Sequence, residues 1–209
     1  MIDITEPTNR LLEEIEIRLK ADPDRRILVA LAGAPASGKS TLATELRRRL
    51  VLRKIPAQVV PMDGFHLDNS VLTERGLLPR KGAPETFDTA GFVACVRRLA
   101  EGGEVVVPVF DRTRDIAIAG AQVVAETDRV AILEGNYLLY DAEPWSELHA
   151  LWDISVRLEV PLDDLRARLI QRWLSHGLSR AAAIRRAEGN DLPNARIVTE
   201  RSLPADIVL

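Results

Sequence analysis

Residues 33–40 have the types and spacing of a phosphate-binding loop. The segment reads Gly-Ala-Pro-Ala-Ser-Gly-Lys-Ser, follows the apolar run 27–31 and leads into a helical pattern. Glycines at both ends of such a loop let backbone N–H groups point at a triphosphate, and the next helix adds partial positive charge. Lys39 can reach the β- and γ-phosphates, and the Ser40 hydroxyl can bind the Mg²⁺ that bridges them. The residues expected to bind a nucleotide are Gly33, Ala34, Pro35, Ala36, Ser37, Gly38, Lys39, Ser40 and Thr41.

Three carboxylates stand where predicted strands end: Asp63, Asp111 and Glu134. Ligands of open α/β sheets bind beyond the carboxyl ends of the strands, so we expect each carboxylate to point toward the phosphate-binding loop. Asp63 could accept or orient the proton of an attacking hydroxyl group, and Glu134 could hold Mg²⁺ directly or through water. The structural alternatives are an Asx turn made by Asp63 with Gly64, and a Glu134 that merely ends a strand.

The elements that must position these groups follow from apolar periodicity. Continuous apolar runs separated by helical or loop material are typical of parallel strands buried on both faces, which predicts a doubly wound, mainly parallel α/β sheet flanked by helices. The predicted strands are 27–31, 57–62, 105–109, 130–133, 154–160 and, at an edge, 207–209. The predicted helices are 8–20, capped by Thr8 or Asn9, then 41–50, 162–174 and 179–188.

Composition restricts the class of protein. A chain of 209 residues that is 46% hydrophobic and 28% charged can bury one core, so we expect a single domain over residues 1–209. A net charge of −3 and 4% aromatic residues argue against a nucleic-acid substrate. No apolar run reaches signal-peptide or membrane-span length, and the single cysteine, Cys95, excludes an internal disulfide bond. These features predict a cytoplasmic protein without a membrane partner; a homodimer is possible, but the sequence leaves the oligomeric state open.

Several further segments resemble one kinase family in order and spacing, over residues 27 to about 180. They are 62–69, which reads Met-Asp-Gly-Phe-His-Leu-Asp-Asn, then 72–78, 80–88, 108–111 and 133–136. These segments resemble bacterial pantothenate kinase and its uridine kinase and phosphoribulokinase relatives. The resemblance implies a P-loop kinase fold and ATP-dependent transfer to a hydroxyl group of a small metabolite. Overall, the chain is most similar to short bacterial proteins often described as nucleoside or sugar kinases, including fructokinase.

The resemblance also implies roles for individual residues. Asp63 corresponds to the catalytic carboxylate and contacts the substrate, Lys39 and Ser40 hold phosphates and Mg²⁺, and Glu134 helps to organise the metal. The resemblance places His66, Arg80 and Lys81 at the acceptor pocket. We also expect the strand-end carboxylates Asp111 and Glu134 to contact the substrate. The Arg80-Lys81-Gly82 sequence independently suits a polar or anionic substrate, although solvated loop charges are the simpler alternative.

Residues 166–180 resemble the lid of these kinases, whose arginines close over the phosphates. A guanidinium group brought in by closure neutralises the charge that spreads over the transferred phosphoryl group. Arg172 is the better candidate for this catalytic role, and Arg168 is expected to contact the nucleotide; a surface position is the alternative for both. By position alone, the segment Asn190-Asp191-x-x-Asn194 would border the adenine pocket.

Two other functions use the same phosphate-binding loop. Residues 88–91 read Asp-Thr-Ala-Gly, the D-x-x-G pattern of GTPase switches, but they do not follow a buried strand and no Asn-Lys-x-Asp sequence occurs in the chain. The second alternative is a nucleotide hydrolase without a metabolite acceptor. The acceptor itself stays open among a sugar such as fructose, a nucleoside and a pantothenate-like alcohol, because the sequence departs from both uridine and pantothenate kinases near Asp111 and after Asn136.

Overall fold

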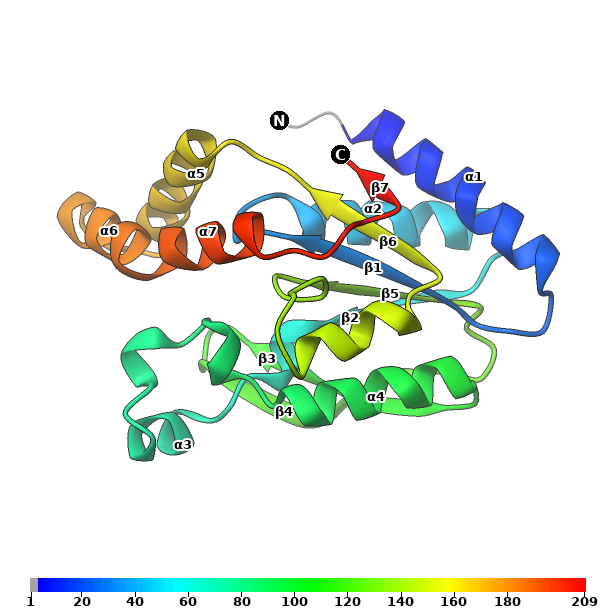
Figure 1. Ribbon diagram of the computed structural model, residues 1–209, viewed down its shortest axis with the longest axis horizontal. Helices are drawn as coiled ribbons and strands as arrows, with labels where there is room; N and C mark the ends of the chain where they lie inside the picture. The colour runs from blue at the N-terminus through cyan, green and yellow to red at the C-terminus, as the bar shows by residue number, and fades with distance from the viewer. Residues whose placement is uncertain (1–3) are drawn as a thin grey trace.

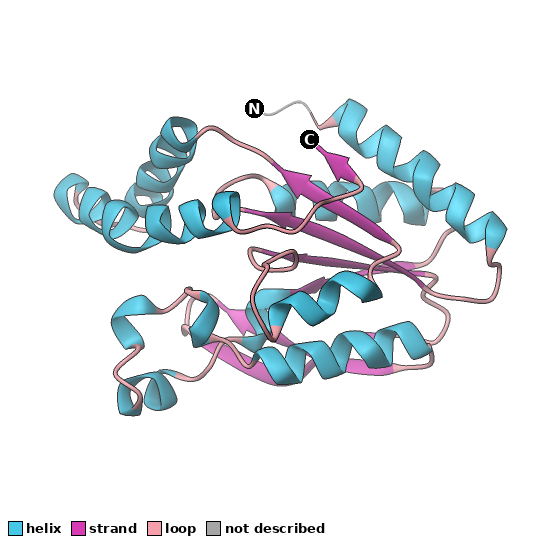
Figure 2. Ribbon diagram, in the orientation of Figure 1, coloured by secondary structure: helices cyan, strands magenta, loops and turns pink. Residues whose placement is uncertain are grey.

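The computed structural model describes residues 4–209 and is organised around a parallel β-sheet. Its five strands lie in the order β2-β5-β1-β6-β7. Figure 2 shows the strands in magenta and the surrounding helices in cyan. The central strand β1 is buried along its whole length. All neighbouring strands pair in parallel, so their carboxyl ends meet at one edge of the sheet. The strand bounds are β1 Ile27–Gly33, β2 Ala57–Pro61, β5 Val130–Gly135, β6 Ile154–Leu158 and β7 Ile207–Val208.

Helices cover both faces of this sheet (Figure 1). Alternate residues of β1 point to opposite faces: Val29 and Leu31 join the apolar cluster formed with helices α1 (Thr5–Ala21) and α2 (Lys39–Leu52). Leu28 and Ala30 join the cluster formed with α4 (Thr89–Glu101) and the 3₁₀ segment η4 (Trp145–Leu151). The prediction of a mainly parallel sheet between helical layers is therefore confirmed.

The strand predicted at 105–109 is not part of the parallel sheet. Strand β3 (Val105–Asp111) pairs antiparallel with β4 (Ile116–Val124) to form a separate two-stranded hairpin, and β4 is absent from the prediction. Near its start β3 buries only alternate residues, Val105 and Val107, with the intervening valine exposed. One buried face is typical of an antiparallel hairpin. The prediction that the apolar run 105–109 is a parallel strand buried on both faces is therefore wrong.

Helix boundaries also differ in two places. Helix α1 begins at Thr5, so neither Thr8 nor Asn9 is its N-cap; Thr8 is buried inside the helix and its hydroxyl donates to the carbonyl of Ile4. The predicted helix 179–188 is a short α6 (Arg180–Arg186) followed by a π-helical turn, η5 (Ala187–Asp191), and then by α7 (Leu192–Glu200).

Two groups of elements flank the carboxyl edge of the sheet (Figure 1). One group consists of α5 (Leu162–Ser175), α6, η5 and α7, which pack on one another through a small apolar cluster. The other contains α3 (Asn69–Glu74), the hairpin and three 3₁₀ turns, η1 (Met62–Phe65), η2 (Leu78–Arg80) and η3 (Pro84–Thr86). Within the described part of the chain, none of the helices has the length and apolar character needed to span a bilayer.

Candidate active site

The phosphate-binding loop joins the end of β1 to the start of α2. A Cβ atom at Gly33 would lie 2.7 Å from Ser37 Oγ and 3.2 Å from Leu158 Cβ, so only glycine permits this close approach. Ala36 and Gly38 have positive φ values of 65° and 103°, which curl the backbone before the helix begins at Lys39. The first N–H groups of α2 therefore face the carboxyl edge of the sheet without helical partners, as anion binding requires.

Lys39 and two carboxylates converge beside this loop. Leu31 of β1 and Pro61 of β2 both lie opposite Glu134 of β5, so Glu134 stands between the loop that follows β1 and the turn that carries Asp63. Burial lowers the pKa of Lys39, and the charges of Glu134 and Asp63 oppose that shift. Burial raises the pKa of Glu134, which is 7% exposed, and the charge of Lys39 opposes the shift. The three groups therefore form one electrostatically coupled cluster.

The donor set at this cluster fits Mg²⁺. The Ser40 hydroxyl lies close enough to Glu134 to oppose the rise in the pKa of that carboxyl, which places a hydroxyl and a carboxylate near each other at the start of α2. Across residues 4–209, no three His, Cys, Asp or Glu side chains are grouped so that they could hold a metal ion by themselves. Mg²⁺ requires no such cage, because it keeps several waters and takes one or two protein oxygens together with phosphate oxygens.

Asp63 lies in the 3₁₀ turn η1, directly after β2, and is held by a residue that the sequence analysis did not select. Its carboxylate accepts a hydrogen bond of 2.6 Å from Arg112 Nη2. The expected alternative, an Asx turn with Gly64, is not the contact that Asp63 makes. Arg112 immediately follows Asp111 in the sequence, so its position at a strand end was the signal that could have identified it.

The structure gathers these residues around one cleft of about 550 Å³. Of the expected site residues, the cleft is lined by part of the phosphate-binding loop together with Asp63, His66, Lys81, Glu134 and Arg172. Residues that the sequence analysis did not select as ligands also line it: Phe87, Phe110, Arg112, Asp115, Asn136, Trp173, His176 and Arg186.

His66 and Lys81 form the side of the cleft opposite the α5–α7 helices. The His66 ring lies between Phe87 and Phe110, with ring centroids 4.1 and 4.6 Å away, and its Nδ1 is 2.8 Å from the Asp63 carbonyl. Burial lowers the pKa of His66. Lys81 Nζ donates to Asn69 Oδ1 at 2.7 Å and pairs with the Asp115 carboxylate at 2.9 Å, so its charge is already matched.

Three expected ligands do not reach the cleft. Arg80 is exposed and pairs with Glu85 at 2.6 Å. Asp111 closes the hairpin turn, where its carboxylate accepts from the backbone of residues 113 and 114 and pairs with the Arg114 guanidinium, so it does not point toward the phosphate-binding loop. Arg168 lines a second cavity, of about 320 Å³, on the other side of that loop.

The α5–α7 helices bring an aromatic residue and two arginines to the cleft. Trp173 Nε1 donates to Asp191 Oδ2 at 2.6 Å, and the guanidinium groups of Arg172 and Arg186 lie 5.8 and 5.3 Å from the Trp173 ring centroid. Burial lowers the pKa of Arg172 and raises that of Asp191. Asn190 Nδ2 donates to the Lys81 carbonyl at 2.9 Å, so the segment expected near adenine contacts the opposite wall of the cleft.

The D-x-x-G pattern at residues 88–91 has a structural explanation. Asp88 is the N-cap of α4, and its Oδ1 accepts from the Gly91 N–H at 2.9 Å. A side chain at Gly91 would overlap the Asp88 carboxylate. The two residues therefore form a helix cap, which removes the main reason to interpret them as a GTPase switch.

Comparisons with known proteins identify the family of this chain. Residues 28–184 match the model of the phosphoribulokinase / uridine kinase family. The chain is 38% identical to "Uncharacterized protein YggC" of Escherichia coli (strain K12), over 95% of this chain and 84% of that protein. It is 36% identical to "Putative uridine kinase C227.14" of Schizosaccharomyces pombe, over 88% and 83%. A crystal structure described as a "putative fructose transport system kinase" from Silicibacter sp. TM1040 superposes with a TM-score of 0.92 at 56% identity, covering 97% of this chain and 98% of that one. The chain therefore belongs to the phosphoribulokinase / uridine kinase family and is a P-loop kinase of small metabolites.

Proposed function

We propose that this kinase transfers the γ-phosphoryl group of ATP, with Mg²⁺, to an alcohol group of a small metabolite. The observation that carries the proposal is the position of Asp63, which lines the same cleft as Lys39 and Glu134 and shares it with polar and aromatic residues outside the phosphate-binding loop, such as His66 and Lys81. A nucleotide hydrolase needs no such second set of residues. The space between His66 and Lys81 on one side and the α5–α7 helices on the other would give an alcohol a place to bind.

Each of these cleft residues has a separate role in an in-line transfer. The acceptor oxygen bonds to the γ-phosphorus while the bond to the β–γ bridging oxygen breaks, and Asp63 takes the proton of the acceptor hydroxyl. Lys39 and Arg172 neutralise charge on the transferred group. Ser40 and Glu134 would hold Mg²⁺, which supplies further neutralisation of the phosphates. Arg112 orients the Asp63 carboxylate through its hydrogen bond.

The second cavity suits the base of the nucleotide. Its walls combine apolar side chains of α2, the end of β6 and the C-terminal residue with the loop residues Ser37 and Gly38 and with Arg168. The Ser37 hydroxyl is buried and has no hydrogen-bond partner among the described residues. An adenine ring here would lie across the loop from the acceptor, with the phosphates between them. We assign Arg168 to nucleotide binding on this basis, and we propose that residues 166–180 close over the phosphates as a lid.

The acceptor candidates are a sugar such as fructose, a nucleoside and a pantothenate-like alcohol. The description of the Silicibacter relative as a fructose transport system kinase, at 56% identity, supports testing fructose first. Both polar and aromatic residues line the acceptor side of the cleft, and this composition is compatible with each class.

A coupled ADP-release screen over hexoses, nucleosides, pantothenate and other hydroxy metabolites tests the proposal. One or more acceptors should raise ADP release well above the rate in water. With that acceptor, Asp63→Asn should keep nucleotide affinity and lower kcat by about 10²- to 10⁴-fold. Asp141→Asn, at an exposed carboxylate paired with Arg201, is the matched control and should keep full activity. Unchanged turnover by Asp63→Asn would show that Asp63 is not the catalytic carboxylate.

A further inference from the structure

The π-helical turn η5 arranges three polar side chains along one wall of the cleft. Arg186 precedes the turn, Asp191 ends it and Asn194 follows within α7. In a regular α-helix, Asp191 would be rotated by about 140° from Arg186. A π-helical turn makes i→i+5 contacts and brings residues five apart onto the same face. Arg186 and Asp191 therefore come to one face, and both line the cleft together with Asn194.

Asn194 is a buried polar residue whose side chain lacks a partner. It is 4% exposed, and within residues 4–209 no hydrogen bond joins its amide group to another residue. Across the cleft, the amide faces the backbone at Gly82, where an added Cβ would lie 3.8 Å from Asn194 Nδ2. The Gly82 N–H already donates to Thr86, and its carbonyl already accepts from Tyr137 at 2.7 Å. The Asn194 amide atoms are not among the fully buried side-chain atoms of residues 4–209 that lack a partner, so the amide is open to the cleft that Asn194 lines, and its N–H groups are free to donate to a ligand there.

Arg186 supplies a positive charge that the cleft does not match. The charged residues of the cleft are five cations, Lys39, Lys81, Arg112, Arg172 and Arg186, and four carboxylates, Asp63, Asp115, Glu134 and Asp191. Lys81 and Arg112 are paired with carboxylates, and Lys39 is coupled to Glu134. The remaining cations are Arg172 and Arg186, and Asp191 is the one remaining carboxylate of the cleft. Asp191 already accepts a hydrogen bond from Trp173, so the positive charges exceed the negative charges by one.

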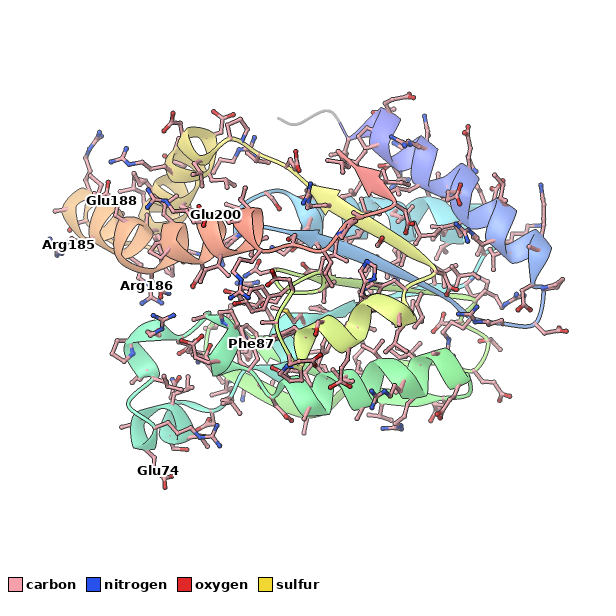
Figure 3. The ribbon with its side chains drawn as sticks, viewed as in Figure 1. Glu74, Phe87, Arg185, Arg186, Glu188 and Glu200 are labelled. Atoms are coloured by element: carbon pink, nitrogen blue, oxygen red, sulfur yellow. The ribbon has the colours of Figure 1, made fainter. Side chains whose placement is uncertain are left out.

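Figure 3 shows where this unmatched charge lies. The Arg186 side chain extends from α6 toward the part of the chain that contains Phe87, whereas Arg185 extends outward. Arg172 has a role at the transferred phosphoryl group in the proposed function. Arg186 is therefore the cation that remains for the acceptor.

We propose that Arg186 and Asn194 bind an anionic group of the acceptor, so that the metabolite carries a carboxylate or a phosphate ester in addition to the hydroxyl that is phosphorylated. This inference rests on the proposed function, because it concerns the acceptor side of the same cleft. The guanidinium matches the charge of either anion, and the Asn194 N–H group donates to one of its oxygens.

Matched pairs of acceptors that differ by the anion test this inference. Suitable pairs are fructose and fructose 6-phosphate, ribose and ribose 5-phosphate, glycerol and glycerate, and pantothenol and pantothenate. Binding is measured by calorimetry in the presence of Mg²⁺ and a non-hydrolysable ATP analogue, and turnover by ADP release. The anionic member of at least one pair should bind more tightly by about tenfold or more, as expected for hydrogen bonds to a charged group.

Three variants locate the effect. Arg186→Gln should abolish that preference by weakening the anionic acceptor about tenfold, with the affinity for the ATP analogue unchanged. Asn194→Asp keeps the side-chain shape and should weaken the same acceptor through repulsion. Arg185→Gln, on the exposed side of α6, should behave as wild type. If Asn194→Asp lowers the melting temperature strongly, the result for Arg186→Gln decides whether the anion site exists. The Arg186 side chain makes no ion pair within the described chain, so its replacement should not destabilise the fold by breaking one.

The two proposals fail in different ways. A neutral acceptor that turns over equally well in wild type and Arg186→Gln would overturn the anion inference and keep the kinase function. An anionic ligand that binds through Arg186 but is never phosphorylated would support the anion site and overturn the assigned reaction. If no member of any pair bound, the acceptor site itself would be wrong.

Discussion

Replacing Gly135 with alanine tests whether contact between β5 and the turn η1 sets the catalytic geometry. Gly135 directly follows Glu134, and Met62 directly precedes Asp63. A Cβ atom at Gly135 would lie 2.5 Å from Met62 Cβ and 2.8 Å from Met62 Sδ. The sulfur could rotate away, but the Cβ atom cannot, so the backbone of β5 or of η1 has to move.

The size of this movement follows from ordinary contact distances. Real Cβ contacts are normally 3.4 Å or longer, so the separation must grow from 2.5 to 3.4 Å, a shift of about 0.9 Å. This shift acts on residues adjacent to Asp63 and Glu134, and a misplacement of about 1 Å can cost about 10²-fold in rate. Overpacking of this kind also destabilises a fold by about 1–3 kcal/mol. We therefore expect Gly135→Ala to lower kcat by about 10²-fold and to lower the melting temperature.

The assay is ADP release with a saturating acceptor, accompanied by thermal unfolding and by binding of an ATP analogue. Nucleotide affinity should fall less than kcat, because Gly33 and Lys39 lie on β1 and α2 rather than on the displaced turn. Gly189→Ala is the matched control, since a Cβ atom there meets open space. A Gly135→Ala protein with wild-type kcat and stability would refute the argument that this contact positions the two carboxylates.

Two further predictions concern single side chains. Lys39→Ala should reduce both nucleotide affinity and turnover, the latter by about 10²-fold or more, while Lys20→Ala at the exposed end of α1 should change neither; an active Lys39→Ala protein would remove the phosphate-binding assignment. Burial lowers the pKa of His66 from 6.5, so below pH 6.5 the unfolded chain gains a proton that the folded chain resists, and the free energy of unfolding should fall with acidification. In urea titrations at several pH values, His66→Phe should lose this part of the decline; identical pH profiles for the two proteins would contradict it.

The nucleotide half of the site could be predicted from sequence because its chemistry is local. A strand, a glycine-rich loop and a helix are consecutive in the chain, so residues 33–40 fix their own geometry. Glu134 and Asp63 were also predictable, because parallel strands end at one edge of the sheet: Glu134 lies near the end of β5, and Asp63 lies two residues after β2. The apolar runs of β1 and β5 are buried on both faces, and this gives a strong signal.

The acceptor half could not be predicted in the same way, because it depends on tertiary contacts. Arg80 and Lys81 are adjacent in the sequence, yet only Lys81 reaches the cleft, since Arg80 pairs with Glu85. Asp111 ends a strand, but that strand belongs to the hairpin, so its carboxylate closes a turn. The π-helical turn that brings Arg186 and Asp191 to one face has no periodic signature, because it interrupts the helical repeat.

The hairpin of β3 and β4 has a consequence for how substrate preference can change in this family. It shares no ladder of backbone hydrogen bonds with the parallel sheet, yet its turn delivers Arg112 and Asp115 to the alcohol-facing wall. Insertions or substitutions in that turn can thus remodel the wall while the strands that hold the triphosphate stay intact. If residues 112–115 are exchanged between this chain and a relative, the acceptor preference should change to that of the relative, and nucleotide binding should stay the same.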